Sequence, residues 1–347
     1  MGGPVNPGTL IIGLTSGDPA GIGPEIALKA WAERARHKLP PFVMYAEPEM
    51  LSARARMLGL CVPVEICQSP DQALSIYPRA LPVIASALSV PANPGKPDSA
   101  NAAGIINAIN SAVDDCAHRR TSAVVTNPIA KSVLYKAGFN HPGHTEYLAE
   151  LSAKHWPGQA HTAVMMLASD MLRIVPLTIH VPLKDVPPLI TKRLISETAH
   201  IVSAALQRDF GISNPRISVA GLNPHAGEGG ALGVEDRDII EPAIKELQRE
   251  GLAITGPHSA DTMFHAAARL RYDAAIAMYH DQALIPVKTL AFDKGVNVTL
   301  GLPFVRTSPD HGTAFDIATQ GQASPGSLVA ALKLAGIMAG RRAKLRV

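Results

Sequence analysis

Three histidines of the chain stand where the chemistry of a metal site would need them. His180 ends the apolar run RIVPLTIH and His280 ends AAIAMYH, while His225 follows RISVAGL within the glycine-rich stretch GLNPHAGEGG. That stretch favours neither a helix nor a strand and suits a loop at the rim of a pocket. Neutral imidazoles at the ends of separate strands can converge on one divalent cation and leave one coordination position open. Their placement therefore indicates a catalytic metal site.

The same placement also has a simpler explanation. The chain has 13 histidines, so several fall at strand ends by chance, and an isolated histidine is more often a hydrogen-bonded structural residue. The spacings of 45 residues (180 to 225) and 55 residues (225 to 280) match no compact zinc motif. The residues alone leave a metal site and three unrelated structural histidines as alternatives.

Charged and polar side chains are concentrated in the segment 278–318. Within it Lys288, Asn297 and Arg306 recur nine positions apart among short β-like runs. Two cations and an amide suit a charged substrate that is rich in oxygen atoms. Lysine and arginine in surface salt bridges are the ordinary alternative.

A possible anion site precedes a helical run in HPGHTEYLAEL, residues 141–151. Thr145 can act as the N-cap of that helix, and His144 can add a positive or hydrogen-bond-donating group beside the free amides at the helix start. Simple capping explains Thr145 equally well, but it does not require His144.

The glycine-rich stretches do not match the usual nucleotide-binding motifs. GDPAGIGPE (17–25) and GEGGAL (227–232) both fail the pattern G-x-G-x-x-G, and a Walker A sequence is absent. A nucleotide would therefore bind outside the Rossmann and P-loop schemes. A plain strand-to-helix turn explains GDPAGIGPE as well as a binding role does.

Short β-branched runs alternate with longer amphipathic stretches along the chain. This alternation is typical of an α/β fold with a largely parallel sheet, in which ligands collect beyond the carboxyl ends of the strands. The expected strands are residues 9–15, 42–46, 123–126, 162–167, 173–180, 216–222 and 274–280, and the expected helices are 102–119, 190–211, 235–250 and 325–340. Residues 89–104 read as a long surface connection.

Length and composition limit the possible classes of protein. The chain of 347 residues exceeds the usual size of one hydrophobic core, so two domains, or one large domain with a lobe, are expected. Its 47% apolar and 18% charged residues are typical of a soluble globular protein, and 4% aromatic residues argue against stacking on nucleic acid bases. Three cysteines without C-x-x-C spacing support neither disulfides nor a zinc ribbon, which fits a reducing cytoplasm.

Neither end of the sequence shows a recognisable targeting signal. The sequence MGGPVNPGTL lacks the patterns of a targeting signal or of myristoylation, and no run of about 18 apolar residues predicts a membrane span. The basic C-terminal sequence RRAKLRV is most simply a solvated tail.

Four separated motifs occur in one order over nearly the whole chain. They are GDPAGIGPE (17–25), NPHAGEGG (223–230), MYHDQ (278–282) and VNVTLGLPFVRTSPDHGTAFDIA (296–318). In this order they closely resemble the 4-hydroxythreonine-4-phosphate dehydrogenase family of vitamin B6 biosynthesis. Four ordered motifs are much harder to obtain by chance than one glycine pattern.

The resemblance implies a fold and an assembly. The subunit would have two α/β/α lobes, like the isocitrate and isopropylmalate dehydrogenases and without a Rossmann motif, with the active site in the cleft. Residues 1–145 with 302–347 would form the first lobe, and residues 146–301 the second, which carries the histidines. A homodimer is implied, in which the partner subunit completes each active site.

The resemblance also implies site residues and cofactors. His180, His225 and His280 would bind one divalent metal, and NAD or NADP would be the oxidant, with cofactor contacts unknown. Imidazole ligands favour zinc or cobalt over magnesium, although the family is described as accepting all three. The implied substrate contacts are His144, Thr145, Asp261, Lys288, Asn297 and Arg306, with Asp261 and Lys288 the catalytic candidates. Asp261 begins the run DTMFHAAARL, so helix capping is its alternative role.

The reaction implied is the oxidation of 4-phosphooxy-L-threonine at C3, followed by decarboxylation to 3-amino-2-oxopropyl phosphate. The nearest alternative is a sister dehydrogenase that acts on 4-phospho-threonate or 4-phospho-erythronate. Two further alternatives belong to other classes: an acyl-phosphate transferase that needs neither metal nor nicotinamide, and a metal-binding or scaffold protein without catalysis. Metal dependence of activity and binding of a nicotinamide nucleotide distinguish these readings.

Overall fold

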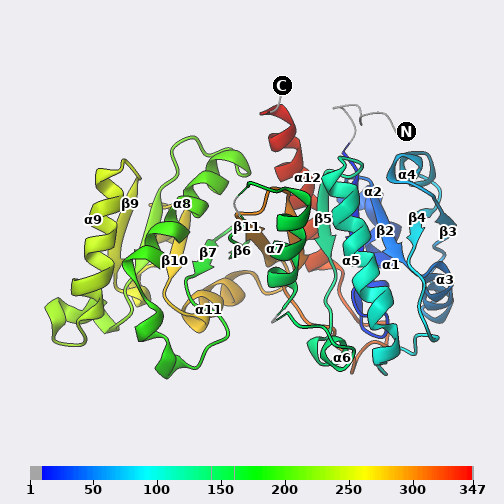
Figure 1. The fold of residues 1–347 in the computed structure, drawn as a ribbon, viewed down its shortest axis with the longest axis horizontal. Helices are drawn as coiled ribbons and strands as arrows, with labels where there is room; N and C mark the ends of the chain where they lie inside the picture. The colour runs from blue at the N-terminus through cyan, green and yellow to red at the C-terminus, as the bar shows by residue number, and fades with distance from the viewer. Residues whose placement is uncertain (1–9, 142, 160, 346–347) are drawn as a thin grey trace. The chain divides into compact units, whose positions relative to one another are not determined.

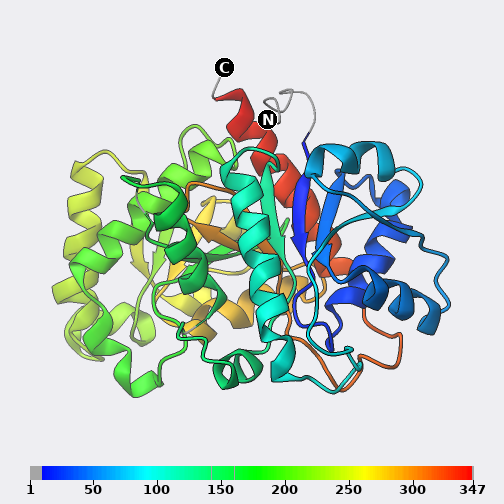
Figure 2. The same ribbon diagram turned by 45° about the vertical axis from the view of Figure 1, so that its right-hand side comes forward.

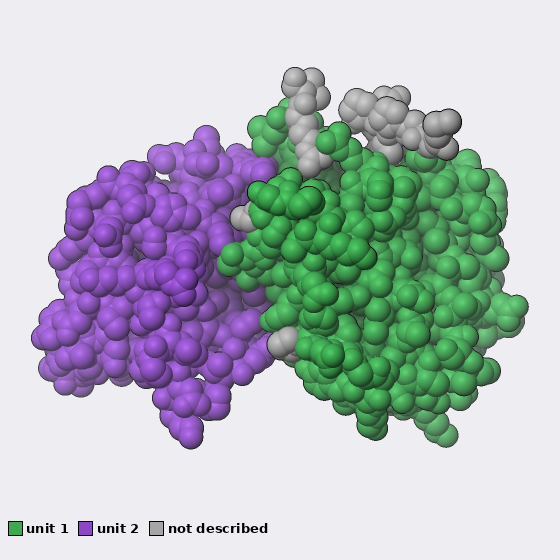
Figure 3. Space-filling view, in the orientation of Figure 1, with its two compact units in different colours: residues 1–163, 302–347 green, residues 164–301 purple. Residues whose placement is uncertain are grey.

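The chain folds into two compact units. The computed structural model describes residues 10–141, 143–159 and 161–345. Unit 1 contains residues 1–163 and 302–347, and unit 2 contains residues 164–301 (Figure 3). The sequence-based division placed the boundary between the first and second lobes between residues 145 and 146. In the structure the helix α7 (His144–His155) packs on α5 (Ala102–Ala117) through Leu148, so the chain crosses only after Ala163.

The sheet of unit 1 is parallel throughout its described strands. Its strand order is β3-β4-β2-β1-β5-β12, and β1 lies between β2 and β5 with Ile12 opposite both Phe42 and Ala123. The strands β1, β2, β5 and β12 are fully buried because helices cover them, whereas the edge strand β3 is partly exposed. Their bounds are β1 (Ile12–Thr15), β2 (Phe42–Ala46), β3 (Val64–Ile66), β4 (Leu81–Ala85), β5 (Ala123–Thr126) and β12 (Arg306–Pro309).

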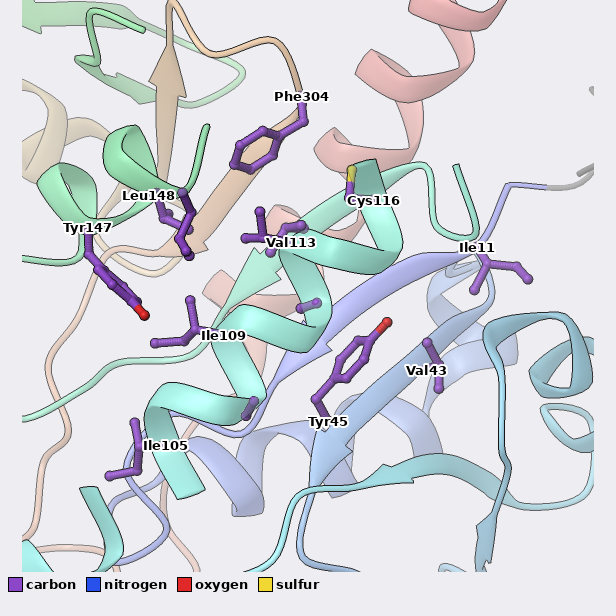
Figure 4. Close-up of a cluster of buried hydrophobic side chains, with 14 of the residues drawn as sticks. Ile11, Val43, Tyr45, Ile105, Ile109, Val113, Cys116, Tyr147, Leu148 and Phe304 are labelled. Atoms are coloured by element: carbon purple, nitrogen blue, oxygen red, sulfur yellow. The ribbon is translucent and has the colours of Figure 1, made fainter. Parts of the chain in front are cut away.

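The main hydrophobic core of unit 1 lies between its sheet and α5. Ile105, Ile109 and Val113 recur at helical spacing on α5 and meet Tyr45 and Val124 of the strands (Figure 4). The long C-terminal helix α12 packs against β12, β5 and β1 (Figures 1 and 2). The helices are α1 (Gly23–Ala32), α2 (Arg34–His37), α3 (Pro48–Met57), α4 (Pro70–Ile76), α5, α6 (Lys131–Lys136), α7 and α12 (Gly326–Lys344), with a 3-10 turn at Ser99–Asn101.

The sheet of unit 2 is mixed. Its strand order is β11-β6-β7-β10-β8-β9, in which β7, β10, β8 and β9 run parallel, while β6 is antiparallel to both β7 and β11. The carboxyl ends of the four parallel strands therefore share one edge. The bounds are β6 (Val164–Ala168), β7 (Arg173–Pro176), β8 (Ile217–Ala220), β9 (Ile254–His258), β10 (Ala274–Ala277) and β11 (Val296–Leu300).

Helices pack against the sheet of unit 2. The helix α11 (His280–Ala291) buries Ala283 and Val287 against Leu167, Ile174 and Ala275 of the strands. The helices α8 (Lys192–Arg208) and α9 (Glu241–Arg249) are amphipathic, pack against each other and bury one face. The remaining elements are α10 (Ala266–Arg269), a π-helical turn at Asp236–Ile240, and 3-10 turns at Leu183–Asp185, Pro187–Leu189, Pro224–Gly230 and Ala260–Thr262.

The expected α/β fold with a largely parallel sheet is confirmed. The strands at 42–46 and 123–126 have the predicted bounds. Those predicted at 173–180, 216–222 and 274–280 end earlier, the first strand begins only at Ile12, and the strand predicted at 162–167 is shifted to Val164–Ala168. The prediction of a solvated C-terminal tail is wrong for its first half: residues up to Lys344 extend α12, and Arg342 is buried, where it donates a hydrogen bond to the carbonyl of Leu302. Residues 1–9 of the N-terminal sequence and residues 346–347 lie outside the described part of the chain.

The connection at residues 89–104 joins β4 to α5, as expected for a long loop, and its surface is mostly exposed or partly exposed. Cys61, Cys67 and Cys116 are free thiols. None of the helices in the described ranges is long and apolar enough to cross a membrane.

Candidate functional site

The three candidate metal ligands follow three neighbouring parallel strands of unit 2. His180 comes four residues after β7, His280 three residues after β10, and His225 five residues after β8. The strand β10 pairs with both β7 and β8, so the three segments leave the same edge of one sheet. The sequence placed His180 and His280 at the ends of strands and His225 in the loop after a strand; the structure places all three in the segments that follow, and His280 begins α11.

Two of the imidazoles face each other. The ring centroids of His180 and His280 are 5.6 Å apart with an angle of 42° between the planes. Both rings line a pocket of about 230 Å³ together with Thr178, Val186 and Tyr279. Two imidazole rings from separate segments thereby line one small pocket.

The ring of His280 is oriented by its chain neighbour. Its Nδ1 lies 2.7 Å from the carboxylate of Asp281. Because a carboxylate accepts a hydrogen bond, this contact places the proton on Nδ1 and leaves Nε2 as the free lone pair. A carboxylate behind a histidine is the usual support of a metal-binding imidazole. Sequence reasoning missed Asp281, although it stands directly after His280 in MYHDQ.

His225 sits in a strained loop. The five consecutive residues 225–229 have positive φ, with φ of 53° at His225, 51° at Ala226 and 44° at Glu228. His180 has a φ of 52° as well. Residues with a Cβ avoid this region, at a cost of about 1–2 kcal/mol each, so it persists only where surrounding contacts enforce it. Strain at two of the three predicted ligands points to function rather than to ordinary loop structure.

A buried carboxylate holds that loop. Asp236, 1% exposed, accepts hydrogen bonds from the backbone N–H groups of Leu222 (2.8 Å) and Asn223 (3.1 Å) and from the side-chain amide of Asn223 (2.9 Å). A Cβ at Gly221 would lie 2.7 Å from its Oδ1 and 2.9 Å from the Cα of Ala226, so only glycine fits there. No local pattern in the sequence singles out Asp236.

We expect Asp236→Ala to lower the free energy of unfolding by about 2–3 kcal/mol, because two buried amides lose their acceptor. Urea unfolding followed by circular dichroism measures the loss. The neighbouring Asp238 is paired with Arg237 on the surface, so Asp238→Ala is the matched control and should leave the unfolding midpoint unchanged. Equal midpoints for the two variants would contradict the anchoring role of Asp236.

The imidazoles of His180, His225 and His280 are suitable ligands for a divalent metal, but the three rings are not gathered around one point. Among the residues that the structure describes, no three histidine, cysteine, aspartate or glutamate side chains are grouped so as to hold a metal ion. The pair His180 and His280 offers two nitrogens, one of them oriented by Asp281, and His225 is carried by the loop after the adjacent strand. A third nitrogen therefore requires a local movement of the His225 loop or side chain.

Asp261 lies beyond the end of β9. It belongs to the 3-10 turn Ala260–Thr262, not to the start of a longer helix as the sequence suggested, and α10 begins only at Ala266. The hydroxyl of Ser259 donates a hydrogen bond of 2.5 Å to its carboxylate, which holds the pKa of Asp261 below its usual value, and His225 acts in the same direction. Asp261 is thus an exposed, ionised carboxylate near the His225 loop.

Lys288 and Asn297 also belong to unit 2. The expectation that Lys288 lies in a β-like run is wrong, since it lies on the last turns of α11, with its Nζ 5.6 Å from the ring of Phe292. Asn297 lies on β11 opposite Leu167, and its Oδ1 is buried without a hydrogen-bond partner. An enclosed acceptor of this kind is satisfied when a ligand or water donates to it.

Arg306 and His144 lie together in unit 1. Arg306 is 4% exposed at the start of β12 and donates from Nη2 (2.7 Å) and Nε (3.2 Å) to the hydroxyl of Thr126 at the end of β5. Burial lowers the pKa of Arg306 to about 10, so it remains a cation at neutral pH. Burial, with the nearby charge of Arg306, holds the pKa of His144 well below its usual value, so its ring is neutral.

The start of α7 contributes to this arginine site. His144 is the first residue of the helix, and its Nε2 is buried without a hydrogen-bond partner. The N-cap is Gly143, so the prediction that Thr145 caps the helix is wrong; Thr145 is the second helical residue, and no side chain caps the helix start. The buried guanidinium of Arg306, the neutral imidazole of His144 and the amides at the start of α7 are groups that can bind an anion, although the carboxylate of Glu146 also lies near Arg306. We call this group the candidate anion site.

The loop GDPAGIGPE, by contrast, is packed into unit 1. Asp18 donates its backbone N–H to the carbonyl of Pro128, and Ile22 donates to that of Thr313. A Cβ at Gly17, where φ is 69°, would lie 2.4 Å from the carbonyl oxygen of Pro128. Close backbone packing therefore explains this glycine, and burial raises the pKa of the Asp18 carboxyl.

An α/β protein with imidazoles at one sheet edge and a candidate anion site has the features of an enzyme for small anionic substrates. The sequence profile of the family described as "Pyridoxal phosphate biosynthetic protein PdxA" matches residues 38–335. The chain belongs to this family, that of the 4-hydroxythreonine-4-phosphate dehydrogenases.

Individual relatives agree with this assignment. The chain is 57% identical to the 4-hydroxythreonine-4-phosphate dehydrogenase of Methylorubrum extorquens, over 96% of this chain and 95% of that protein. It is 53% identical to that of Bradyrhizobium diazoefficiens, over 94% and 96%. The crystal structure of the enzyme from Klebsiella pneumoniae superposes with a TM-score of 0.84 at 35% identity, covering 95% of this chain and all of that one.

Proposed function

We propose that the chain catalyses the oxidation of the C3 hydroxyl of 4-phosphooxy-L-threonine by NAD or NADP. The resulting β-keto acid then loses carbon dioxide to give 3-amino-2-oxopropyl phosphate, a precursor of pyridoxine 5'-phosphate. Family membership supports this reaction. The single structural observation behind it is the arrangement of His180, His225 and His280 after neighbouring parallel strands of one sheet.

His180, His225 and His280 are the residues that would hold a divalent metal. Such a metal, when bound, supplies a Lewis acid that makes a nearby hydroxyl more acidic and a carbonyl more polar. Because the three ligands are imidazoles, zinc or cobalt suits them better than magnesium, which prefers oxygen. Elemental analysis of protein purified without chelator identifies the metal.

The candidate anion site of unit 1 suits the substrate phosphate. Arg306 supplies a fixed positive charge, His144 supplies a neutral donor, and the amides at the start of α7 together with Thr145 supply further hydrogen bonds. The phosphate is the more highly charged of the two substrate anions and gains most from such a site. Lys288 then remains for the carboxylate, and the unpartnered Oδ1 of Asn297 can accept from a substrate N–H or O–H group.

Asp261 and Lys288 are the candidates for proton movement. Oxidation at C3 removes a hydride, which the nicotinamide ring accepts, and a proton from the hydroxyl. Asp261 is ionised at neutral pH, so it can accept that proton or bind the substrate ammonium. Loss of carbon dioxide leaves an electron pair on carbon that must be protonated, and Lys288 carries protons that it can donate.

A homodimer in the cytoplasm, with each active site completed by the partner subunit, is part of the proposal. Mixing Arg306→Met with His225→Ala tests the shared site, because the first change damages unit 1 and the second unit 2. In mixed dimers one site then carries both changes and the other carries neither, so about a quarter of all sites regain activity after random exchange. No recovery after exchange, verified by native mass spectrometry, would place all site residues in one chain.

The substrate decides between this reaction and its nearest alternative, a dehydrogenase of 4-phospho-threonate or 4-phospho-erythronate. These substrates carry a hydroxyl at C2 where 4-phosphooxy-L-threonine carries an ammonium. NADH or NADPH formation from each compound, with added zinc or cobalt, should be fastest with the amino acid. Faster turnover of a sugar-acid phosphate would overturn the proposed substrate.

A further inference from the structure

A continuous chain of hydrogen bonds crosses the strand ends that carry the three histidines. The hydroxyl of Thr178, two residues before His180, donates to the carbonyl of Met278 (2.8 Å). The N–H of Met278, two residues before His280, donates to Oε1 of Gln282 (2.6 Å). The side-chain amide of Gln282 in turn donates to the carbonyl of Gly221 (2.8 Å).

The chain of bonds continues from Gly221 to the next strand. The N–H of Gly221 donates to the carbonyl of His258 (2.8 Å), the last residue of β9 and three residues before Asp261. Gly221 itself starts the loop of His225, at a position where a Cβ would meet Asp236 and Ala226 within 3.0 Å. Gly221 thus connects the segment after β8 with the end of β9 and with the first turn of α11.

Two side chains, those of Thr178 and Gln282, supply the bonds that ordinary strand pairing does not. Thr178 is buried, and its hydroxyl strengthens the connection between the segments after β7 and β10, where the backbone N–H of Thr178 also donates to the carbonyl of Met278 (3.3 Å). Gln282 is partly buried on the first turn of α11 and connects the segment after β10 with the segment after β8. Neither side chain has been given a role in the proposed reaction.

We propose that Thr178 and Gln282 are positioning residues that fix the spacing of the segments carrying His180, His225 and His280, and so set the affinity of the site for a divalent metal. The inference rests on the proposed function, because it assumes that the three imidazoles share one cation. Outer residues that orient ligand-bearing groups typically contribute a factor of about 10–100 in metal affinity.

The test measures metal binding without turnover. Co²⁺ is titrated into apoprotein, and binding is followed by the visible absorption of the ion and by equilibrium dialysis. Gln282→Met keeps the length of the side chain but removes both hydrogen bonds, and we expect a dissociation constant that is about 10–100-fold higher. The absorption of the bound ion should also change, since the ligands are less well fixed.

Gln248→Met is the matched control. Gln248 of α9 donates a similar bond of 2.7 Å to the carbonyl of Ile254, at the opposite edge of the same sheet. Loss of that bond should leave Co²⁺ affinity unchanged. It should lower the melting temperature of the apoprotein about as much as Gln282→Met does. Equal Co²⁺ affinity for Gln282→Met and wild type would overturn the inference.

Thr178 provides an independent test should Gln282→Met fail to fold. Thr178→Val preserves shape but removes the hydroxyl, and it should weaken Co²⁺ binding, while Thr178→Ser restores the hydroxyl and should bind nearly as wild type does. Equal affinities for valine and serine would count against the positioning role. If wild-type apoprotein takes up no Co²⁺, the metal site of the proposed function fails and the inference fails with it.

Discussion

We expect the variant His225→Ala to lose metal on dialysis and to have a kcat/KM lower by about 10³-fold or more, with the fold intact. The loss is large because a metal held by three imidazoles has no spare protein ligand, and losing even an outer supporting group costs 10–100-fold in affinity. The fold survives because His225 is exposed, and its loop is anchored by Asp236 rather than by the imidazole. Elemental analysis, steady-state kinetics and thermal unfolding measure the three effects.

His200→Ala is a suitable control for this experiment. His200 is an exposed histidine of unit 2 on α8, paired with Glu250 and remote in sequence from the strand ends. Its removal should change neither metal content nor turnover. The assignment of His225 would be wrong if His225→Ala remained fully loaded with metal and active at the wild-type rate.

The edge that carries the histidines could be predicted because it depends on local signals. Short β-branched runs identify strands, and the carboxyl ends of parallel strands meet at one edge whatever the order of the strands. The strands at 42–46 and 123–126 formed as predicted for this reason. By contrast, β9 with the sequence ITGPH and β12 with RTSP lack the apolar pattern of a strand, and pairing within the fold determines them.

The contacts that support the site could not be predicted, because they join distant parts of the sequence. Gln282 and Gly221 are 61 residues apart, and Arg306 and Thr126 are 180 apart, so no local pattern connects them. The helix α11 could not be predicted either, because proline normally ends a helix and Pro286 lies inside this one. The helix continues past Pro286 and carries Lys288. The candidate residues could therefore be named from the sequence, whereas the contacts that support them emerged only from the fold.

Replacement of the buried arginine is expected to have the second large effect. Arg306→Met should lower kcat/KM by about 10²-fold, mainly through a higher KM, because the substrate phosphate loses a charge-assisted pair of hydrogen bonds. Arg306→Lys should recover only part of the loss, since an ammonium lacks the planar fork of a guanidinium. Thr126→Val removes the hydroxyl that holds the guanidinium and should cost less than either.

Arg306→Met should also change the pKa of His144, which can be measured independently of activity. The charge of Arg306 and burial both depress the pKa of His144, burial being the larger cause. Without that charge the pKa of His144 should rise but stay below its usual value of about 6.5, as NMR titration of the ring can show. The folded state favours the neutral ring of His144. The contribution of this ring to the free energy of unfolding is therefore fully present above the usual pKa of about 6.5, and it is lost as the pH falls through the lower pKa of the folded state. Arg306→Met should therefore lose less stability on acidification than the wild type does. An unchanged pKa of His144 in this variant would show that the charge of Arg306 does not act on His144.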